Sequence, residues 1–310
     1  CALLSAMLTL GAGAAFADHL LNWLRDPLKP GLRWEDAPFE AGSDHFIFSD
    51  PHVNVPMPMV IQLPDKFYHT SADTLDKVSP LSLQRSGILA ASYAYWLATA
   101  GRQEVLWLGQ LMAAQLGTAA DRRGLKAVQG AGADEGARRA AWQSYSQQSR
   151  FALESAQRSF GSLERLDPAA AGLAPAWRQA VADRYAAADA WVRAALQVDA
   201  GQAAPEAKPA WRAEAEQLIP RVIDYGAAEI GNHIQVADRS VREAYWRLYD
   251  MPGPSMHMRS VLVQFWADGA RSVAEITDCI ALETGHPADG RVLEICRVMA
   301  DLNVLELRPA

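Results

Sequence analysis

The middle of the chain, from about Glu104 to Ala237, contains no run of residues that would suit a β-strand. Alanine, arginine, glutamate and glutamine predominate there, and the apolar residues recur at the spacing of an amphipathic helix. This stretch is therefore expected to fold as helices. Breaks are expected at Asp167-Pro168 and along Asp199 to Pro209, and the predicted helices cover residues 137–166, 174–198 and 211–231.

Two local features of this region bear on its packing. The segment from Gly117 to Gly136 is rich in glycine and charge, which predicts a mobile connection. Tryptophans can line a substrate groove, but on alanine-rich helices they are expected to pack a bundle together; these are Trp142, Trp177, Trp191 and Trp211. His233 has no partner at metal-ligand spacing and is interpreted as a capping or surface histidine.

The residues from about Pro254 to Ala310 show a separate pattern. Periodicity and capping residues predict helices over 256–267, 272–284 and 287–302, with Gly285 as a C-cap, followed by a strand over 304–307. Three helices and a terminal strand resemble a winged-helix module. The segment from Phe265 to Ile276 resembles the turn between the first two helices of such modules.

The charge of this tail argues against a nucleic-acid partner. From Met256 onward there are five arginines and eight acidic residues, and the whole chain carries a net charge of −7. Phosphate binding needs clustered lysine and arginine, so docking to protein or dimerisation is the expected role of the tail. The three cysteines show no C-x-x-C spacing, which indicates a reducing, cytoplasmic compartment.

The first hundred residues suggest a different architecture. An apolar run from Met57 to Leu63, bounded by prolines, predicts a short buried strand. His69 would then lie in the loop at the carboxyl end of that strand, where open α/β sheets usually place ligands. Ser79-Pro80 has the composition of a helix start, and the helix is predicted to continue to about Thr99.

Three pieces of this region carry a family resemblance. The first is Gly42-Ser43-Asp44-His45-Phe46-Ile47-Phe48, the second is Val55-Pro56 followed by the predicted strand, and the third is Tyr68-His69-Thr70 with Asp73-Thr74 shortly after. In order and spacing they resemble the last metal-ligand segment of the zinc-dependent aminopeptidase family M28, whose relatives include animal glutaminyl cyclases. The resemblance covers roughly Gly42 to Val78, a minor part of the chain.

The resemblance implies roles for individual residues. His69 matches the final zinc-ligating histidine of the family, so Zn²⁺ is the implied cofactor. Tyr68 matches a neighbour whose phenol, in some members, points at the developing oxyanion. Asp44 matches an acidic residue of the proton-relay network in the cyclase branch. Asp73 has two interpretations, a carboxylate supporting the metal site and a turn-former before Thr74.

The rest of the family pattern is missing. Such an enzyme needs a His-x-Asp pair, a Glu-Glu pair and one further acidic ligand upstream, and neither pair occurs anywhere in this chain. The metal site therefore cannot close from this chain alone. Two explanations remain: a C-terminal portion of a longer enzyme, which the opening Cys1 favours, and a degenerate relative that kept the fold without the chemistry.

Two further interpretations concern the N-terminal region. Cys1 to Phe16 is apolar, but it lacks a basic segment and is short for a membrane span, so that with its continuation to Leu24 it is interpreted as a packing helix. The other is a self-contained metal site, which is disfavoured because nothing makes its members converge; these would be Asp44, His45, Asp50, His52 and His69.

The sequence thus predicts an α/β fold followed by a mainly α fold. Residues 1–103 would form the C-terminal part of an M28-like peptidase domain, residues 104–240 a helical region and residues 241–310 a winged-helix-like domain. The expected function is that of a zinc aminopeptidase acting on peptides through metal-activated water, with this chain inactive by itself. The alternative is a non-catalytic scaffold that uses the helical and winged-helix regions for protein contacts or homo-oligomerisation.

Overall fold

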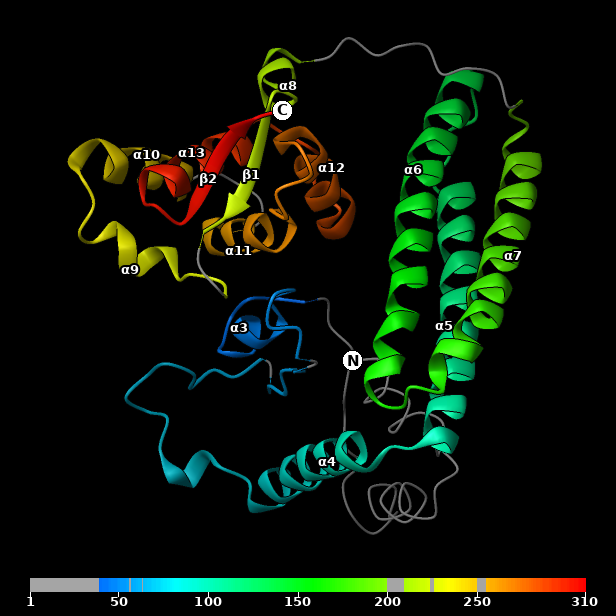
Figure 1. Ribbon diagram of the computed structural model, residues 1–310, viewed down its shortest axis with the longest axis horizontal. Coiled ribbons are helices and arrows are strands. Elements are labelled where there is room, and N and C mark those ends of the chain that lie inside the picture. Colours follow the sequence, from blue (N-terminus) through cyan, green and yellow to red (C-terminus); the bar gives the residue numbers. More distant parts are fainter. Residues whose placement is uncertain (1–38, 56, 63, 200–208, 224–225, 250–254) are drawn as a thin grey trace. The chain divides into compact units, whose positions relative to one another are not determined.

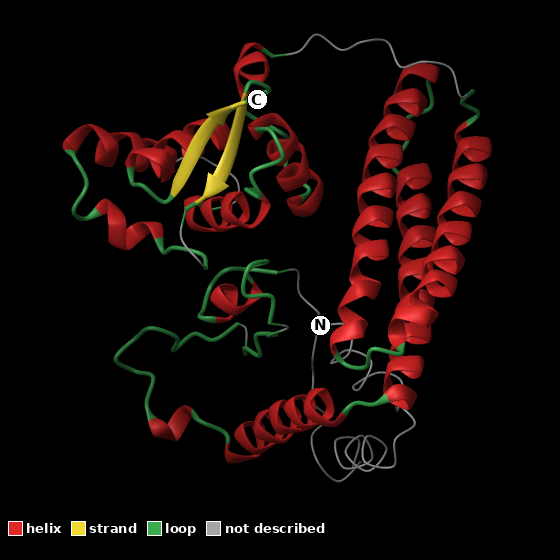
Figure 2. Cartoon of the chain, in the orientation of Figure 1, coloured by secondary structure: helices red, strands yellow, loops and turns green. Residues whose placement is uncertain are grey.

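The computed structural model describes residues 39–55, 57–62, 64–199, 209–223, 226–249 and 255–310. Contacts divide the chain into two compact units, of which the first includes residues 60–202 and the second includes residues 38–59 and 203–310. Helices dominate both units, and the strands of the described part form a single two-stranded sheet, drawn yellow in Figure 2. A mainly helical fold is therefore observed, and each unit is described below by itself.

The first unit contains a three-helix bundle. Its long helices α5, α6 and α7 pack against one another and lie side by side in Figure 1. The elements of this unit are η1 (Leu75–Lys77), α4 (Pro80–Thr99), α5 (Arg102–Gln129), α6 (Glu135–Ser159), η2 (Phe160–Arg165) and α7 (Ala170–Leu196). Helix α4 begins as predicted, because the Ser79 hydroxyl accepts from the Ser82 N–H and Pro80 occupies the first turn.

The bundle core follows one stripe of α7. Its buried residues recur every three or four positions, as a helix packed on two neighbours requires; they are Ala170, Ala174, Trp177, Val181, Tyr185, Ala188, Val192 and Leu196. Trp177 is only 8% exposed and stacks on Phe160, and the Trp142 ring packs at the edge of the core near Tyr145. The prediction that these tryptophans pack helices together is confirmed for both.

The prediction of a mobile connection from Gly117 to Gly136 is wrong for most of its length, because α5 runs unbroken to Gln129. The glycines permit close helix packing. A Cβ on Gly124 would lie 2.6 Å from the Val192 side chain, and one on Gly117 would lie 3.3 Å from that of Arg184. Packing against α7 therefore offsets a glycine cost of about 1 kcal/mol per residue in a helix.

The second unit combines short helices with the two-stranded sheet. Its elements are α3 (His45–Ser49), α8 (Ala210–Ala215), β1 (Leu218–Val222), α9 (Ile230–Ile234), α10 (Arg239–Tyr249), α11 (Met256–Trp266), α12 (Val273–Thr284), α13 (Arg291–Asp301) and β2 (Leu305–Pro309). The strands are antiparallel, with Leu218 opposite Pro309 and Val222 opposite Leu305. The buried core gathers apolar residues from α8 to β2, including Leu262, Ile276, Leu293 and Met299.

The helices predicted after Pro254 are confirmed. Ser272 and Glu275 form a reciprocal capping box at the start of α12, and Gly285 ends that helix with a φ of 73°. The terminal strand is also present as β2. By contrast, the helix predicted over residues 211–231 is wrong, because α8 ends at Ala215 and β1 follows. Pro220 cannot donate a helical hydrogen bond, and β2 supplies the partner that a strand needs.

The strand predicted from Met57 to Leu63 is also wrong for the residues described, since residues 57–62 have no regular secondary structure. A strand needs a neighbour to pair its backbone groups, and β1 pairs with β2 and, at Arg221, with Asp268, but not with residues 57–62. The helix interpreted over Cys1 to Leu24 lies outside the described residues. The expected boundary after residue 103 falls inside the first unit, and the one after residue 240 falls within α10.

Candidate functional site

The loop that carries Tyr68 and His69 is held by local hydrogen bonds. An Asp65 carboxylate oxygen accepts from the Phe67 N–H at 2.9 Å, and the Thr70 hydroxyl donates to the Phe67 carbonyl at 2.6 Å. Asp73 donates its N–H to the Thr70 carbonyl. These bonds shape two consecutive turns, and His69 lies inside the first of them, in the left-handed region with a φ of 58°. A non-glycine residue in that region is uncommon, and such residues are found more often at functional sites.

The two site residues predicted in this loop lie together. The rings of Tyr68 and His69 stack with centroids 3.8 Å apart and an interplanar angle of 19°. Both side chains are exposed, and within the described chain neither imidazole nitrogen of His69 has a hydrogen-bond partner. The imidazole is therefore free to bind a ligand from outside the loop.

Asp44 lies elsewhere, in the second unit. It is exposed and precedes α3 as its N-cap residue, but its carboxylate makes no capping hydrogen bond. Among the described residues no three histidine, cysteine or acidic side chains come together as a metal site would require. His69 thus offers one nitrogen, whereas zinc in proteins takes about four ligands. The donors within the described chain do not make a zinc site.

The self-contained metal site is likewise not assembled. Asp50 and His52 do pair, with the carboxylate accepting from the His52 N–H at 2.7 Å and lying 2.9 Å from its Nδ1. His45 is instead buried, with the Phe39 ring against its edge. The pair of Asp50 and His52 results from a local turn that the sequence analysis did not anticipate.

His257 makes several polar contacts that the sequence analysis did not predict. Its Nε2 donates to the Ala41 carbonyl at 2.5 Å, its Nδ1 lies 3.3 Å from a Glu229 carboxylate oxygen, and the Phe46 ring meets it edge to face. These contacts attach the segment around α3 to the start of α9 and to α11. The role they support is structural. His233, by comparison, is exposed on α9, as its interpretation as a surface histidine required.

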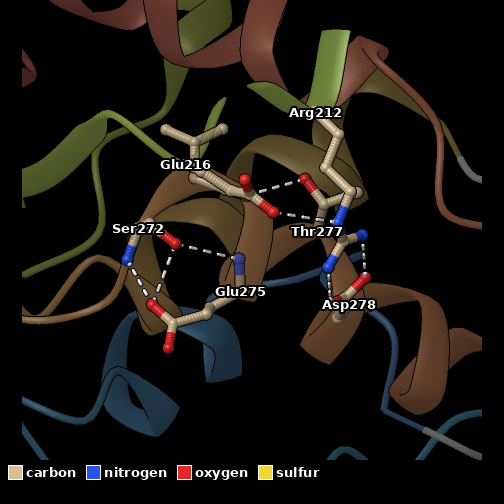
Figure 3. A network of polar contacts seen from close by, with 7 residues as sticks. Arg212, Glu216, Ser272, Glu275, Thr277 and Asp278 are labelled. Carbon is tan, nitrogen blue, oxygen red and sulfur yellow. Dashed lines mark hydrogen bonds and ion pairs between the residues drawn. The ribbon is translucent and has the colours of Figure 1, made fainter. Parts of the chain in front are cut away.

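A polar network joins α8 to α12 (Figure 3). The Arg212 guanidinium donates to both carboxylate oxygens of Asp278, at 2.9 and 2.5 Å, and lies 3.5 Å from Glu216. The hydrogen bond to Asp278 is the main reason that the pKa of Arg212 is raised. Every charge in this network has a partner, which is the pattern of a structural tie between two helices.

A second polar group lies in the helical bundle. One Asp189 carboxylate oxygen on α7 accepts from the Tyr145 hydroxyl at 2.8 Å and from the Ser149 hydroxyl at 2.9 Å, both on α6. Burial raises the pKa of Tyr145, and the hydrogen bond to Asp189 raises it further. Tyr145 and Ser149 are nearly inaccessible to solvent. This group specifies how α6 and α7 face each other and has no opening for a substrate.

Comparisons with known proteins do not add a family. No family model matches the sequence, and no curated protein and no solved structure is significantly similar to it. Among the helices of the described residues, none combines the length and the apolar character that a bilayer span demands. The loop of Tyr68 and His69 is thus the candidate site that the geometry and the sequence support best.

Proposed function

We propose that the chain is the C-terminal part of a zinc-dependent aminopeptidase of the M28 type, which hydrolyses the N-terminal peptide bond of its substrates in the cytoplasm. The observation that carries the proposal is the exposed imidazole of His69, which stacks on Tyr68 and has no hydrogen-bond partner in the described chain. A structural histidine would be expected to bond to the surrounding protein. A metal ligand needs one nitrogen free for the ion.

A second observation supports the view that this region is part of a larger α/β domain. Among the described residues, ten of the seventeen exposed large hydrophobic side chains lie between residues 47 and 83, four of them in the second unit and six in the first. Such concentrations indicate that other protein segments cover each of these stretches. The ten are Ile47, Phe48, Val55, Met57, Val60, Ile61, Tyr68, Leu75, Val78 and Leu83.

The backbone of the same region also supports the view that another segment packs against it. Within the described chain, the N–H and C=O groups of residues 57–62 have no hydrogen-bond partner. Unpaired backbone groups next to exposed β-branched residues are what an unpaired strand presents.

In this proposal His69 binds the zinc ion together with ligands that the described residues do not supply. A zinc ion held there would supply an activated water for attack on the peptide bond. The Tyr68 hydroxyl can donate a hydrogen bond to an oxygen that becomes negatively charged during attack on a peptide carbonyl.

The test starts from the coding sequence upstream of Cys1. A His-x-Asp pair and a Glu-Glu pair in the same frame are expected, and the extended protein should then bind zinc and hydrolyse an aminoacyl-anilide. His69→Ala should abolish turnover and lower the zinc content without unfolding the protein. His233→Ala is the matched control, since His233 is also exposed. An upstream sequence without these pairs, or an active His69→Ala variant, would leave the non-catalytic scaffold as the better account.

A further inference from the structure

Helix α10 carries an exposed stripe that the described residues of its unit do not cover. The stripe consists of Arg239, Arg242, Trp246 and Tyr249, which are all exposed. The opposite side of the helix packs into the core through Val241, Ala244, Tyr245 and Leu248. At 100° per residue, the four stripe residues lie within a quarter of the helix surface.

The aromatic end of the stripe is unusually accessible. Trp246 and Tyr249 each keep 51% of their surface exposed, and their rings meet edge to face with centroids 5.3 Å apart. Tryptophan, tyrosine and arginine are the residue types that contribute most to protein interfaces. Their combination on one helix face therefore indicates an interface.

Of the two arginines of the stripe, only one has an ion-pair partner among the described residues. Arg239 forms an ion pair with Glu243 at 2.7 Å, one helical turn further on. Arg242 is exposed, and its guanidinium has no partner among the described residues. The stripe thus presents, among the described residues, an uncompensated guanidinium toward one end and two half-exposed aromatic rings toward the other. A guanidinium above an aromatic ring is a favourable contact, so each end complements the other.

The spacing of the stripe is symmetric. Successive members are three, four and three residues apart, so the pattern reads the same from both ends about Ala244. If two copies of α10 pack antiparallel, a two-fold axis near Ala244 sets Arg242 opposite the second copy's Trp246 and Arg239 opposite its Tyr249. Each of these two contacts then forms twice, which gives four in all, as a two-fold interface requires.

We propose that this stripe is a dimerisation surface, and that its occupant is the same stripe of a second copy of this chain. The proposal goes beyond the aminopeptidase function and does not depend on it. A contact based on one helix of eleven residues is smaller than the roughly 1,200 Å² of a standard interface. The dimer is therefore weak and reversible, with a dissociation constant of about 100 µM or tighter.

A complementation experiment tests the pairing. Arg239→Ala/Arg242→Ala removes both cations, and Trp246→Ala/Tyr249→Ala removes both rings. Each variant alone lacks every cation–ring contact and should be monomeric in sedimentation equilibrium up to about 0.5 mM. An equimolar mixture keeps one complete set of contacts, from the cations of one chain to the rings of the other. The mixture should therefore associate more than either variant alone and less than the wild type.

Controls separate this pairing from other causes. Arg247→Ala removes an exposed cation of the same helix that lies off the stripe, and it should dimerise like the wild type. Circular dichroism checks that each variant keeps its helices, and a reducing buffer excludes disulfide dimers. A wild-type chain that stays monomeric to about 0.5 mM would overturn the proposal. So would ring-deleted chains that still dimerise, or a mixture that remains monomeric, because the stripe would then serve another partner.

Discussion

The side chain of Gln264 binds both backbone groups of Ala228. Its Oε1 accepts from the Ala228 N–H at 2.6 Å, and its Nε2 donates to the Ala228 carbonyl at 3.1 Å. Gln264 itself is fully buried on α11. The Gln264 amide thus pairs with the Ala228 backbone in the way that a neighbouring strand would. It thereby holds in place the segment that leads into α9.

Replacing this glutamine should destabilise the second unit strongly. Gln264→Ala removes the partner of both backbone groups of the partly buried Ala228 and opens a cavity at a fully buried position, and we expect a loss of about 2 to 4 kcal/mol in the free energy of unfolding. Chemical denaturation measures the change. Gln235→Ala, at an exposed position after α9, is the control and should change stability by less than about 0.5 kcal/mol. Equal effects of the two substitutions would contradict the role of the amide.

The tie between Arg212 and Asp278 should show a measurable coupling. Their side chains are 25% and 40% exposed, so solvent weakens the pair, but both guanidinium–carboxylate bonds are made. In a double-mutant cycle with Arg212→Ala and Asp278→Ala, we expect a coupling energy of about 0.5 to 1.5 kcal/mol. The coupling should fall as salt is raised. A coupling near zero at low salt would show that the two residues act independently.

Two glycines should respond in opposite directions to the same substitution. A Cβ on Gly109 would lie 2.4 Å from the Trp177 ring, whereas one on Gly87 of α4 would meet nothing within 4 Å. Gly109→Ala should therefore destabilise the bundle by about 1 to 3 kcal/mol despite its better helix propensity. Gly87→Ala should stabilise the protein by roughly 0.5 to 1 kcal/mol. Thermal and chemical unfolding of both variants give the comparison.

Tyr145 should make the bundle sensitive to alkaline pH. Its pKa is raised in the folded protein by burial and by Asp189, so the neutral phenol is favoured in the fold. The unfolded chain releases this proton at about pH 10, and the stabilisation is therefore present below that pH and lost as the pH rises above it. Tyr145→Phe should lose stability less steeply than the wild type between about pH 9 and pH 11. Parallel curves would exclude this contribution.

The isolated chain should bind zinc weakly and show no peptidase activity. His69 offers one nitrogen, and one ligand cannot fix the geometry of the ion. Calorimetric titration with zinc and an assay with an aminoacyl-anilide measure the two properties. Robust hydrolysis by the purified chain would contradict the assignment of the missing ligands to another segment.

The elements that could be predicted from the sequence are those whose ends are set by neighbouring residues. The helix after Ser79-Pro80 and the one between Ser272 and Gly285 are capped by side chains within a few positions. A window of a dozen residues contains all the information that such helices need. The boundaries observed there agree with those expected.

The misassigned segments depend on distant partners. Strand β1 pairs with β2, which comes about 85 residues later in the sequence. The residues next to Pro220 therefore contain no signal from which a strand could be predicted. The glycines of α5 lie where α7 approaches, and that contact cannot be read from α5 alone. At the candidate site, the pairing of Tyr68 with His69 follows from adjacency in sequence. His257 was missed because its partners Ala41 and Glu229 come from two other segments.

The antiparallel pairing of β1 with β2 affects how the order of the elements in this unit could be changed. Because Leu218 lies opposite Pro309, the chain enters and leaves this group of helices at neighbouring points, about 5 Å apart. A short linker could join these points, and new ends could be opened in the exposed turn after Gly285 without cutting a helix or strand. A transfer of this group to a host protein would have to include α8 and the segment around α3 as well, because both pack against its helices.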